Sequence, residues 1–273
     1  PRGKQSELFY SHGCDYTRTT GIWQTVWLEF LPETHIEKIK IFPSVETGSF
    51  DVEALLKGAG TLTVEAAYEG RPMGAASVIK LTVMAELFRQ LEAGLVRRDQ
   101  KITVRDEDRV PICGVLTLMH TGLEVTPIDL CWLMITISDN MATNLLIDLL
   151  GLDNIQANNR QLGLEGVALN RKLFETREAF CGKRNTVSAR GVARLLELIW
   201  KRQLVSESAS GEMLEMLLAQ QCTNKMPLLL AEGETAHKTG EDEGITHDVG
   251  IVLAKNPFLV CFCNWELEPG TEG

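Results

Sequence analysis

The sequence predicts an α+β fold. Its middle is strongly helical from about residue 77 to residue 220, whereas the segments 236–239, 247–254 and 257–265 are rich in Val, Ile and Phe and are typical of strands. Strand-like segments also precede the helices, so we expect the sheet to be completed by the C-terminal part of the chain. A length of 273 residues, 44% of them apolar, suffices for one large domain or two modest ones.

The first fifty residues are rich in aromatic side chains and are interrupted by Gly and Pro. They predict short strands over 22–30 and 39–42. Residues 51–57 then predict a helical turn, and residues 62–68 predict a strand that ends in a turn. We treat residues 1–50 as a separate N-terminal segment with no assigned role.

The helical middle carries clear start and stop signals. A long helix is predicted from Ser77 to Glu92, with Thr82 and Glu86 outside its apolar stripe. Thr126 followed by Pro127 predicts a capped start for a second helix. Further helices are predicted over 141–150, 191–201 and 211–220. The apolar stripe of the first helix consists of Leu81, Met84, Phe88 and Leu91.

Charge and composition exclude several function classes. The net charge is −10, from 27 basic and 37 acidic residues, which argues against a nucleic-acid partner because phosphate binding needs a basic face. No apolar run approaches the ~18 to 20 residues of a membrane span. The seven cysteines include no Cys-x-x-Cys pair, so neither a zinc site nor a dense disulfide framework is predicted. No signal peptide is visible, and the compartment stays undecided.

Three short motifs could carry chemistry. Ser77 and Lys80 lie three residues apart at a helix start, so both side chains share one face and the lysine could take the serine proton. Taken by itself, this pair is typical of a serine that caps a helix and a lysine that faces solvent. The segment 138–140, Ser-Asp-Asn, is by itself a helix cap, and the segment 238–240, Lys-Thr-Gly, is a strand end. In this order, however, the three motifs form the signature of active-site serine β-lactamases and penicillin-binding proteins.

The chain from about residue 54 to residue 265 resembles the class A β-lactamase family, particularly its divergent members. The resemblance rests on the segments 76–80, 137–144, 169–172 and 237–240. It implies a β-lactamase/transpeptidase-like fold, in which an antiparallel sheet flanked by helices is joined to an all-α subdomain. The expected division is therefore an α/β subdomain of residues 51–76 and 225–273 and an all-α subdomain of residues 77–224, with the site in the cleft between them.

The resemblance also implies a role for each matching residue. Ser77 would attack the β-lactam carbonyl, Lys80 would act as base or proton relay, and Ser138 would pass a proton to the departing nitrogen. The backbone N–H groups of Ser77 and Glu241 would stabilise the oxyanion. No metal or organic cofactor is implied. The positions expected to bind substrate are Asn140, Asn170, Lys238, Thr239, Gly240 and Glu241.

One departure from the family concerns the base for deacylation. Class A enzymes carry a glutamate four residues before the asparagine that corresponds to Asn170, where this chain has Gly166. Glu165 is one residue early, so either the loop shifts to bring Glu165 to the water or Glu165 is a solvated carboxylate. We therefore predict normal acylation by Ser77 with slow or impaired deacylation.

Two further departures concern charge and cysteine pairing. Carboxylates at positions 241–243 adjoin the expected carboxylate-binding site and would repel an anionic substrate unless they point outward. Many class A enzymes link the serine helix to the helix before Ser-Asp-Asn by a disulfide. Cys131 matches one half of that bond, but Met84 occupies the other position, so we expect Cys131 to be a buried thiol.

The leading interpretation is a class A-like serine β-lactamase that acts on a small-molecule β-lactam or a peptidoglycan-like peptide. Two alternatives stay open: a penicillin-binding D-Ala-D-Ala peptidase or esterase on the same fold, and a β-lactam-binding module without turnover. We expect a monomer, and the resemblance implies a bacterial, extracytoplasmic protein.

Overall fold

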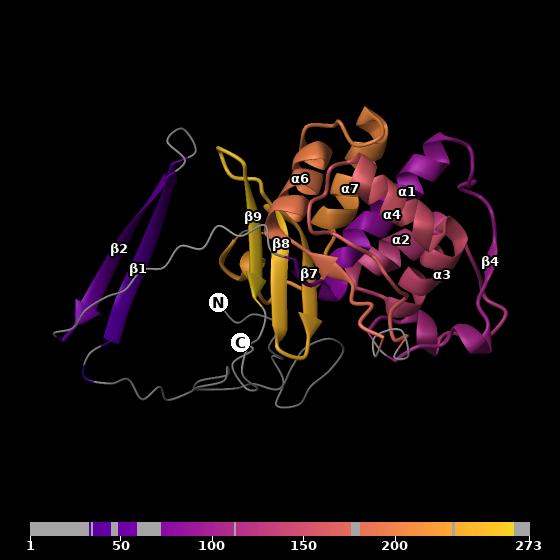
Figure 1. The fold of residues 1–273 in the computed structure, drawn as a ribbon, viewed down its shortest axis with the longest axis horizontal. Helices are drawn as coiled ribbons and strands as arrows, with labels where there is room; N and C mark the ends of the chain where they lie inside the picture. Colours follow the sequence, from indigo (N-terminus) through magenta and orange to yellow (C-terminus); the bar gives the residue numbers. More distant parts are fainter. Residues whose placement is uncertain are drawn as a thin grey trace, which may run out of the picture. The chain divides into compact units, whose positions relative to one another are not determined.

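A computed structural model describes residues 33, 35–44, 49–58, 72–111, 113–175, 181–230 and 233–264. The chain divides into two compact units, residues 1–67 and 68–273. The first unit contributes one described hairpin, and every other described helix and strand belongs to the second (Figure 1). The strands predicted over 22–30 and 62–68 lie outside the described residues.

The hairpin of the first unit pairs β1, His35–Ser44, with β2, Ser49–Lys57, in antiparallel register. The strand predicted over 39–42 is confirmed as part of β1. The helical turn predicted over 51–57 is wrong, because these residues begin with alternating polar and apolar side chains and pair along their length with β1. The predicted boundary at residue 50 falls inside β2, and the proposed domain division stays a prediction.

The helix predicted from Ser77 begins as a 3₁₀ turn. This turn, η1, spans Ala76–Ile79, and α1 continues over Lys80–Glu92. Thr82 and Glu86, predicted to lie off the apolar stripe, are buried as well, because three other helices pack against α1. The Glu86 carboxylate accepts hydrogen bonds from two neighbouring side chains of α1, which satisfies it inside the core.

Three helices follow in the second unit: α2, Pro127–Thr136; α3, Asn140–Leu150; and α4, Leu152–Gln161. The predicted start of α2 is confirmed, since the Thr126 hydroxyl accepts the N–H of Asp129 and the Asp129 carboxylate accepts the N–H of Thr126. We did not predict α4, because its sequence is mostly polar and lacks a continuous apolar stripe.

The three C-terminal strands that the sequence predicts are confirmed, and they form an antiparallel sheet in the order β7-β8-β9. Figure 1 shows the helices together on one side of this sheet. Helix α7 packs against β7, whereas α6 packs against β8 and β9. These elements span Ala189–Trp200 (α6), Glu207–Leu218 (α7), Thr235–Asp242 (β7), Ile245–Val252 (β8) and Phe258–Asn264 (β9).

Short elements connect these parts. β3 pairs with β6 and β4 pairs with β5, each in antiparallel fashion. None of the described helices is long and apolar enough to cross a membrane. The short strands span Met73–Gly74 (β3), Ile102–Thr103 (β4), Glu124–Val125 (β5) and Thr186–Val187 (β6), and the 3₁₀ turns span Asp106–Asp108 (η2), Leu116–Leu118 (η3) and Met226–Leu229 (η4).

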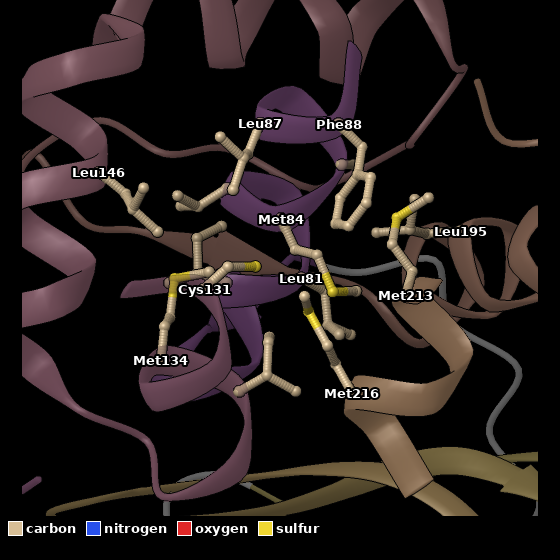
Figure 2. Packing of buried hydrophobic residues seen from close by; sticks show 14 of the residues in the cluster. Leu81, Met84, Leu87, Phe88, Cys131, Met134, Leu146, Leu195, Met213 and Met216 are labelled. Carbon is tan, nitrogen blue, oxygen red and sulfur yellow. The ribbon is translucent and has the colours of Figure 1, made fainter. Parts of the chain in front are cut away.

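The main core of the second unit surrounds α1. Figure 2 shows side chains from α2, α3, α6 and α7 gathered around Leu81, Met84 and Phe88. Cys131 is confirmed as a buried free thiol, and burial raises its pKa far above the usual range. This core fixes the start of α1, and with it the position of Ser77.

Candidate active site

A cavity of about 1000 Å³ opens at the start of α1. Its walls come from segments that are far apart in the sequence, including η1, the turn before α3 and the β7-β8 hairpin. The lining includes two serines, two cysteines and both signs of charge. Among the lining residues are Ser77, Cys113, Ser138, Asn140, Arg171, Arg184, Asn185, Cys222, Thr239, Glu241, Asp242 and Glu243.

Ser77 stands on a strained turn at the cavity wall. The residue before it, Ala76, has φ of 41°, in the left-handed region that residues with a Cβ rarely occupy. Ser77 itself is partly exposed to the cavity, whereas Val78 and Ile79 after it are buried in the core. The turn therefore presents the serine hydroxyl to the cavity while its neighbours anchor the chain.

Lys80 lies one turn further along and is completely buried. Its Nζ donates to the carbonyl and the hydroxyl of Ser138, at 2.7 and 2.9 Å, and to Asn140 Oδ1 at 2.8 Å. Burial, and then the positive charge of Lys238, lower the pKa of Lys80 well below its ordinary value. The three donated bonds use all three N–H groups of the protonated amine, and the lowered pKa favours the loss of one of these protons. The neutral amine then has a lone pair that can take a proton.

Lys238 reaches the same serine from β7. Its Nζ donates to Ser138 Oγ at 3.1 Å and to the carbonyl of Thr239 at 2.7 Å, and burial lowers its pKa to about 8. The Ser138 oxygen thus accepts from two lysines, which leaves its own proton free to be donated into the cavity. Ser138 has φ of 59°, a second left-handed position at this site.

Asp139 holds the loop opposite Ser77 in place. One carboxylate oxygen accepts the N–H of Ala142 at 2.9 Å and caps α3, as expected for this motif read alone. The other accepts the N–H groups of Val115 and Leu116, each at 2.8 Å. Gly114 is required beside it, since a Cβ at that position would stand 2.2 Å from the Asp139 carboxylate, and its φ is +104°. Asp139 therefore couples the loop before α2 to the Ser138 turn.

Strand β7 closes the cavity against η1. A Cβ on Gly240 would lie 3.3 Å from the Ser77 backbone nitrogen and 3.1 Å from Val78, so glycine allows this close approach. Thr239 and Glu241 flank it and line the cavity. The structure therefore brings together the segments predicted to carry the nucleophile and the oxyanion donors.

The negative charge of the β7-β8 hairpin is partly compensated by a lysine. Glu241 is paired with Lys225 at 2.6 Å, and its side chain is 64% exposed. The Lys225 Nζ also donates to Thr246 Oγ1 at 2.6 Å. Asp242 and Glu243 line the cavity rim and are exposed. An anionic substrate would therefore meet Glu241 as half of an ion pair rather than as an isolated carboxylate.

Glu165 is not brought to the cavity. Its side chain is 66% exposed and pairs with Arg190 at 3.4 Å, and Glu165 is not among the lining residues. Asn170 is used to hold the loop, since its Nδ2 donates to the carbonyl of Arg184 at 2.7 Å. The next residue, Arg171, lines the cavity. Of the two positions that the sequence left open for Glu165, the structure therefore shows the solvated carboxylate.

Several lining residues carried no recognisable sequence signal. Cys113 and Cys222 belong to the scattered cysteines, and Asn185 lies on a loop that matches no chemical motif. Arg171 lies in the matching segment 169–172, but no role was predicted for it. Only their tertiary placement identifies them. Within the described ranges, no group of three or more His, Cys, Asp or Glu side chains is arranged to hold a metal ion.

Comparison with known proteins identifies the family and similar folds. The sequence model of the β-lactamase enzyme family matches residues 50–264. The β-lactamase of Sphaerobacter thermophilus is 31% identical, covers 81% of this chain and 80% of its own, and superimposes with a TM-score of 0.70. A PBP-A variant solved as an acyl-enzyme complex with penicillin G is 26% identical, covers 72% of this chain and 75% of its own, and has a TM-score of 0.66.

An ancestral class A β-lactamase is 24% identical, covers 85% of this chain and 86% of its own, and has a TM-score of 0.69. At that identity the likeness shows the fold alone, and it confirms the predicted β-lactamase/transpeptidase-like α+β architecture. The family match extends over most of the sequence, from β2 to β9, and agrees with the resemblance found in the motifs. The chain therefore belongs to the β-lactamase enzyme family.

Proposed function

We propose that this protein opens β-lactam rings through an acyl-enzyme on Ser77 and releases the product slowly. The observation that carries the proposal is the hydrogen-bonded arrangement of Lys80, Ser138 and Lys238 beside the Ser77 cavity. It supplies an amine with a lowered pKa, three residues after the nucleophile at the start of the same helix, and a hydroxyl that can donate a proton.

In acylation, Lys80 takes the proton as Ser77 Oγ attacks the lactam carbonyl. The backbone N–H groups of Ser77 and Glu241 stabilise the oxyanion. When the C–N bond breaks, Ser138 donates its proton to the ring nitrogen, and its oxygen regains a proton from the neighbouring lysine. The product at this stage is an ester of Ser77 that retains every atom of the lactam.

Substrate binding uses the opposite wall. Lys238 and Thr239 bind the substrate carboxylate by charge and hydroxyl, and Asn140 holds both Lys80 and a substrate amide. Lys225, paired with Glu241, keeps the adjoining carboxylate from acting as an uncompensated negative charge.

Slow deacylation is supported by the position of Glu165. Its exposed side chain pairs with Arg190 instead of facing Ser77, so it is poorly placed to activate a water at the ester. The carboxylates among the described residues that do line the cavity are Glu241 and its two neighbours on the β7-β8 hairpin. The same observation favours the alternative of a penicillin-binding peptidase, in which the penicillin adduct lasts.

Intact-protein mass spectrometry after addition of penicillin tests the proposal. We expect a mass increase equal to the whole penicillin on Ser77 that persists for many turnovers of an ordinary β-lactamase, together with a burst of one product per enzyme. Ser77→Ala should abolish the adduct, and Ser208→Ala, an exposed serine on α7, should retain it. Absence of any Ser77 adduct would overturn the proposal. Rapid turnover that Glu165→Gln abolishes would overturn the slow-deacylation part.

A further inference from the structure

Two cysteines line the same cavity as Ser77. Cys113 lies on the loop before α2 and is exposed, whereas Cys222 follows α7 and is partly buried. The cavity also contains Ser138, which belongs to the catalytic arrangement. The proposed hydrolysis uses neither thiol.

Both cysteines are held firmly at the edges of the catalytic arrangement. The carbonyl of Cys113 accepts the N–H of Asn140 at 3.1 Å, and the Cys113 thiol lies 3.5 Å from the carbonyl of Ile137. On the other side, the N–H of Cys222 donates to Gln220 Oε1 at 3.0 Å. A group attached to the Cys113 sulfur therefore stays beside the turn that carries Ser138, and a group attached to Cys222 stays at the wall of the same cavity.

Both thiols are also within electrostatic reach of the buried amines. Cys113 and Cys222 each raise the pKa of Lys80, opposing the effect of its burial, and both act in the same direction on Lys238. The two cysteines line one cavity together with Ser77 and Ser138, although they come from segments more than one hundred residues apart. Substituents on them would occupy the space through which a substrate reaches those lysines.

Other cysteines of the described chain differ in chemistry or position. Cys131 is fully buried, and burial raises the pKa of Cys261 to about 12 and that of Cys263 to about 11, so these thiols stay protonated and unreactive near neutral pH. Cys181 is exposed but does not line the cavity. Among the described cysteines, the exposed thiols therefore lie either at the cavity or at Cys181, which provides an internal control.

We propose that Cys113 and Cys222 form a thiol modification site that controls access to Ser77, with low-molecular-mass disulfides as its reagents. A cysteine thiolate attacks one sulfur of the disulfide, a new S–S bond forms, and the other sulfur leaves as a thiolate, so the small disulfide is the oxidant and one thiol is released per adduct. Cys113 reacts first because it is the more exposed. The attached group fills the cavity, and a dithiol reductant reverses the modification. The effect on catalysis rests on the proposed function, but the modification itself does not.

The test treats the full chain with 5,5′-dithiobis(2-nitrobenzoate) and maps the adducts by peptide mass spectrometry. We expect adducts on Cys113 and Cys222, and loss of penicillin acylation at Ser77 that dithiothreitol restores. The double variant Cys113→Ser/Cys222→Ser should acylate equally with and without treatment, whereas Cys181→Ser should lose acylation on treatment as the parent does.

Two results would overturn the proposal: adducts confined to cysteines other than Cys113 and Cys222, or full modification of these two thiols with unchanged acylation relative to the untreated protein. Failure of the proposed function is distinguishable, because untreated protein would then form no Ser77 adduct at all. In that case the mapped adducts decide whether the thiol site exists, and adducts on Cys181 alone still reject it.

Discussion

Replacing Asp139 by Asn should release the loop that carries Cys113 while leaving the cap of α3 almost intact. Asn and Asp are nearly equal as N-caps, so the bond to the N–H of Ala142 can be kept by the amide oxygen. The amide nitrogen then faces the N–H groups of Val115 and Leu116, which are both donors and lose their acceptor.

The expected loss of stability follows from the hydrogen bonds that Val115 and Leu116 lose. A hydrogen bond to a charged group contributes ~1.5–3 kcal/mol, and such losses are not fully additive, so we expect a decrease of about 3 kcal/mol in the free energy of unfolding. For a unit of this size, that decrease corresponds to a Tm lower by about 6–12 °C. If the amide rotates instead, the N–H of Ala142 loses its acceptor, and a smaller decrease is expected.

Urea denaturation followed by circular dichroism measures the global change, and hydrogen exchange measures the local one. The amide of Leu116, in a buried residue, should exchange faster in Asp139→Asn than the global loss of stability accounts for. Asp153→Asn is the matched control, since Asp153 is exposed in the first turn of α4 and should change stability by less than about 0.5 kcal/mol. If Asp139→Asn behaves like this control, the coupling through Asp139 is refuted.

Two other predictions concern the core and the catalytic lysines. Leu81→Ala should lower the free energy of unfolding by ~2–5 kcal/mol because Leu81 is 1% exposed. Leu118→Ala is the control, since Leu118 is 68% exposed and its loss should change the free energy of unfolding little. Similar urea midpoints for both variants would contradict the packing described. The rate of Ser77 acylation should rise with pH as Lys80 loses its proton and fall above about pH 8 as Lys238 becomes neutral and no longer attracts the substrate carboxylate. Stopped-flow acylation across this range checks the profile, and a rate that keeps rising well above pH 8 would show that the charge of Lys238 is not needed.

Motif order predicts the catalytic arrangement better than it predicts the loops. Lys80, Ser138 and Lys238 stand on elements whose type and order can be predicted from capping signals and periodicity, and the structure brings them into hydrogen-bond contact. Glu165 could not be placed in this way, because the partner that fixes its side chain, Arg190, belongs to a different element. Local spacing carries no information about such a tertiary pairing.

Secondary-structure errors have similar causes. The segment 51–57 forms a strand because the strand just before it in the chain, β1, pairs with it in a hairpin, an interaction that the composition of 51–57 does not reveal. Helix α4 is stabilised by packing against α1 and α3 rather than by a strong apolar stripe. The cavity thiols are invisible for a third reason, since nothing in the neighbourhood of Cys113 or Cys222 along the chain indicates that the two segments meet.

The wide sequence separation of Lys80 and Lys238 also sets an order of events during biosynthesis. Ser138 lies 58 residues after Lys80, and Lys238 lies 100 residues after Ser138. At ~5–20 residues per second, the ribosome needs roughly 5–20 s to synthesise that second interval. Throughout it Ser77 and Lys80 lack Gly240 and the strand that carries it, so under the proposed function a newly made chain reacts with a β-lactam only after β7 has emerged and docked against η1.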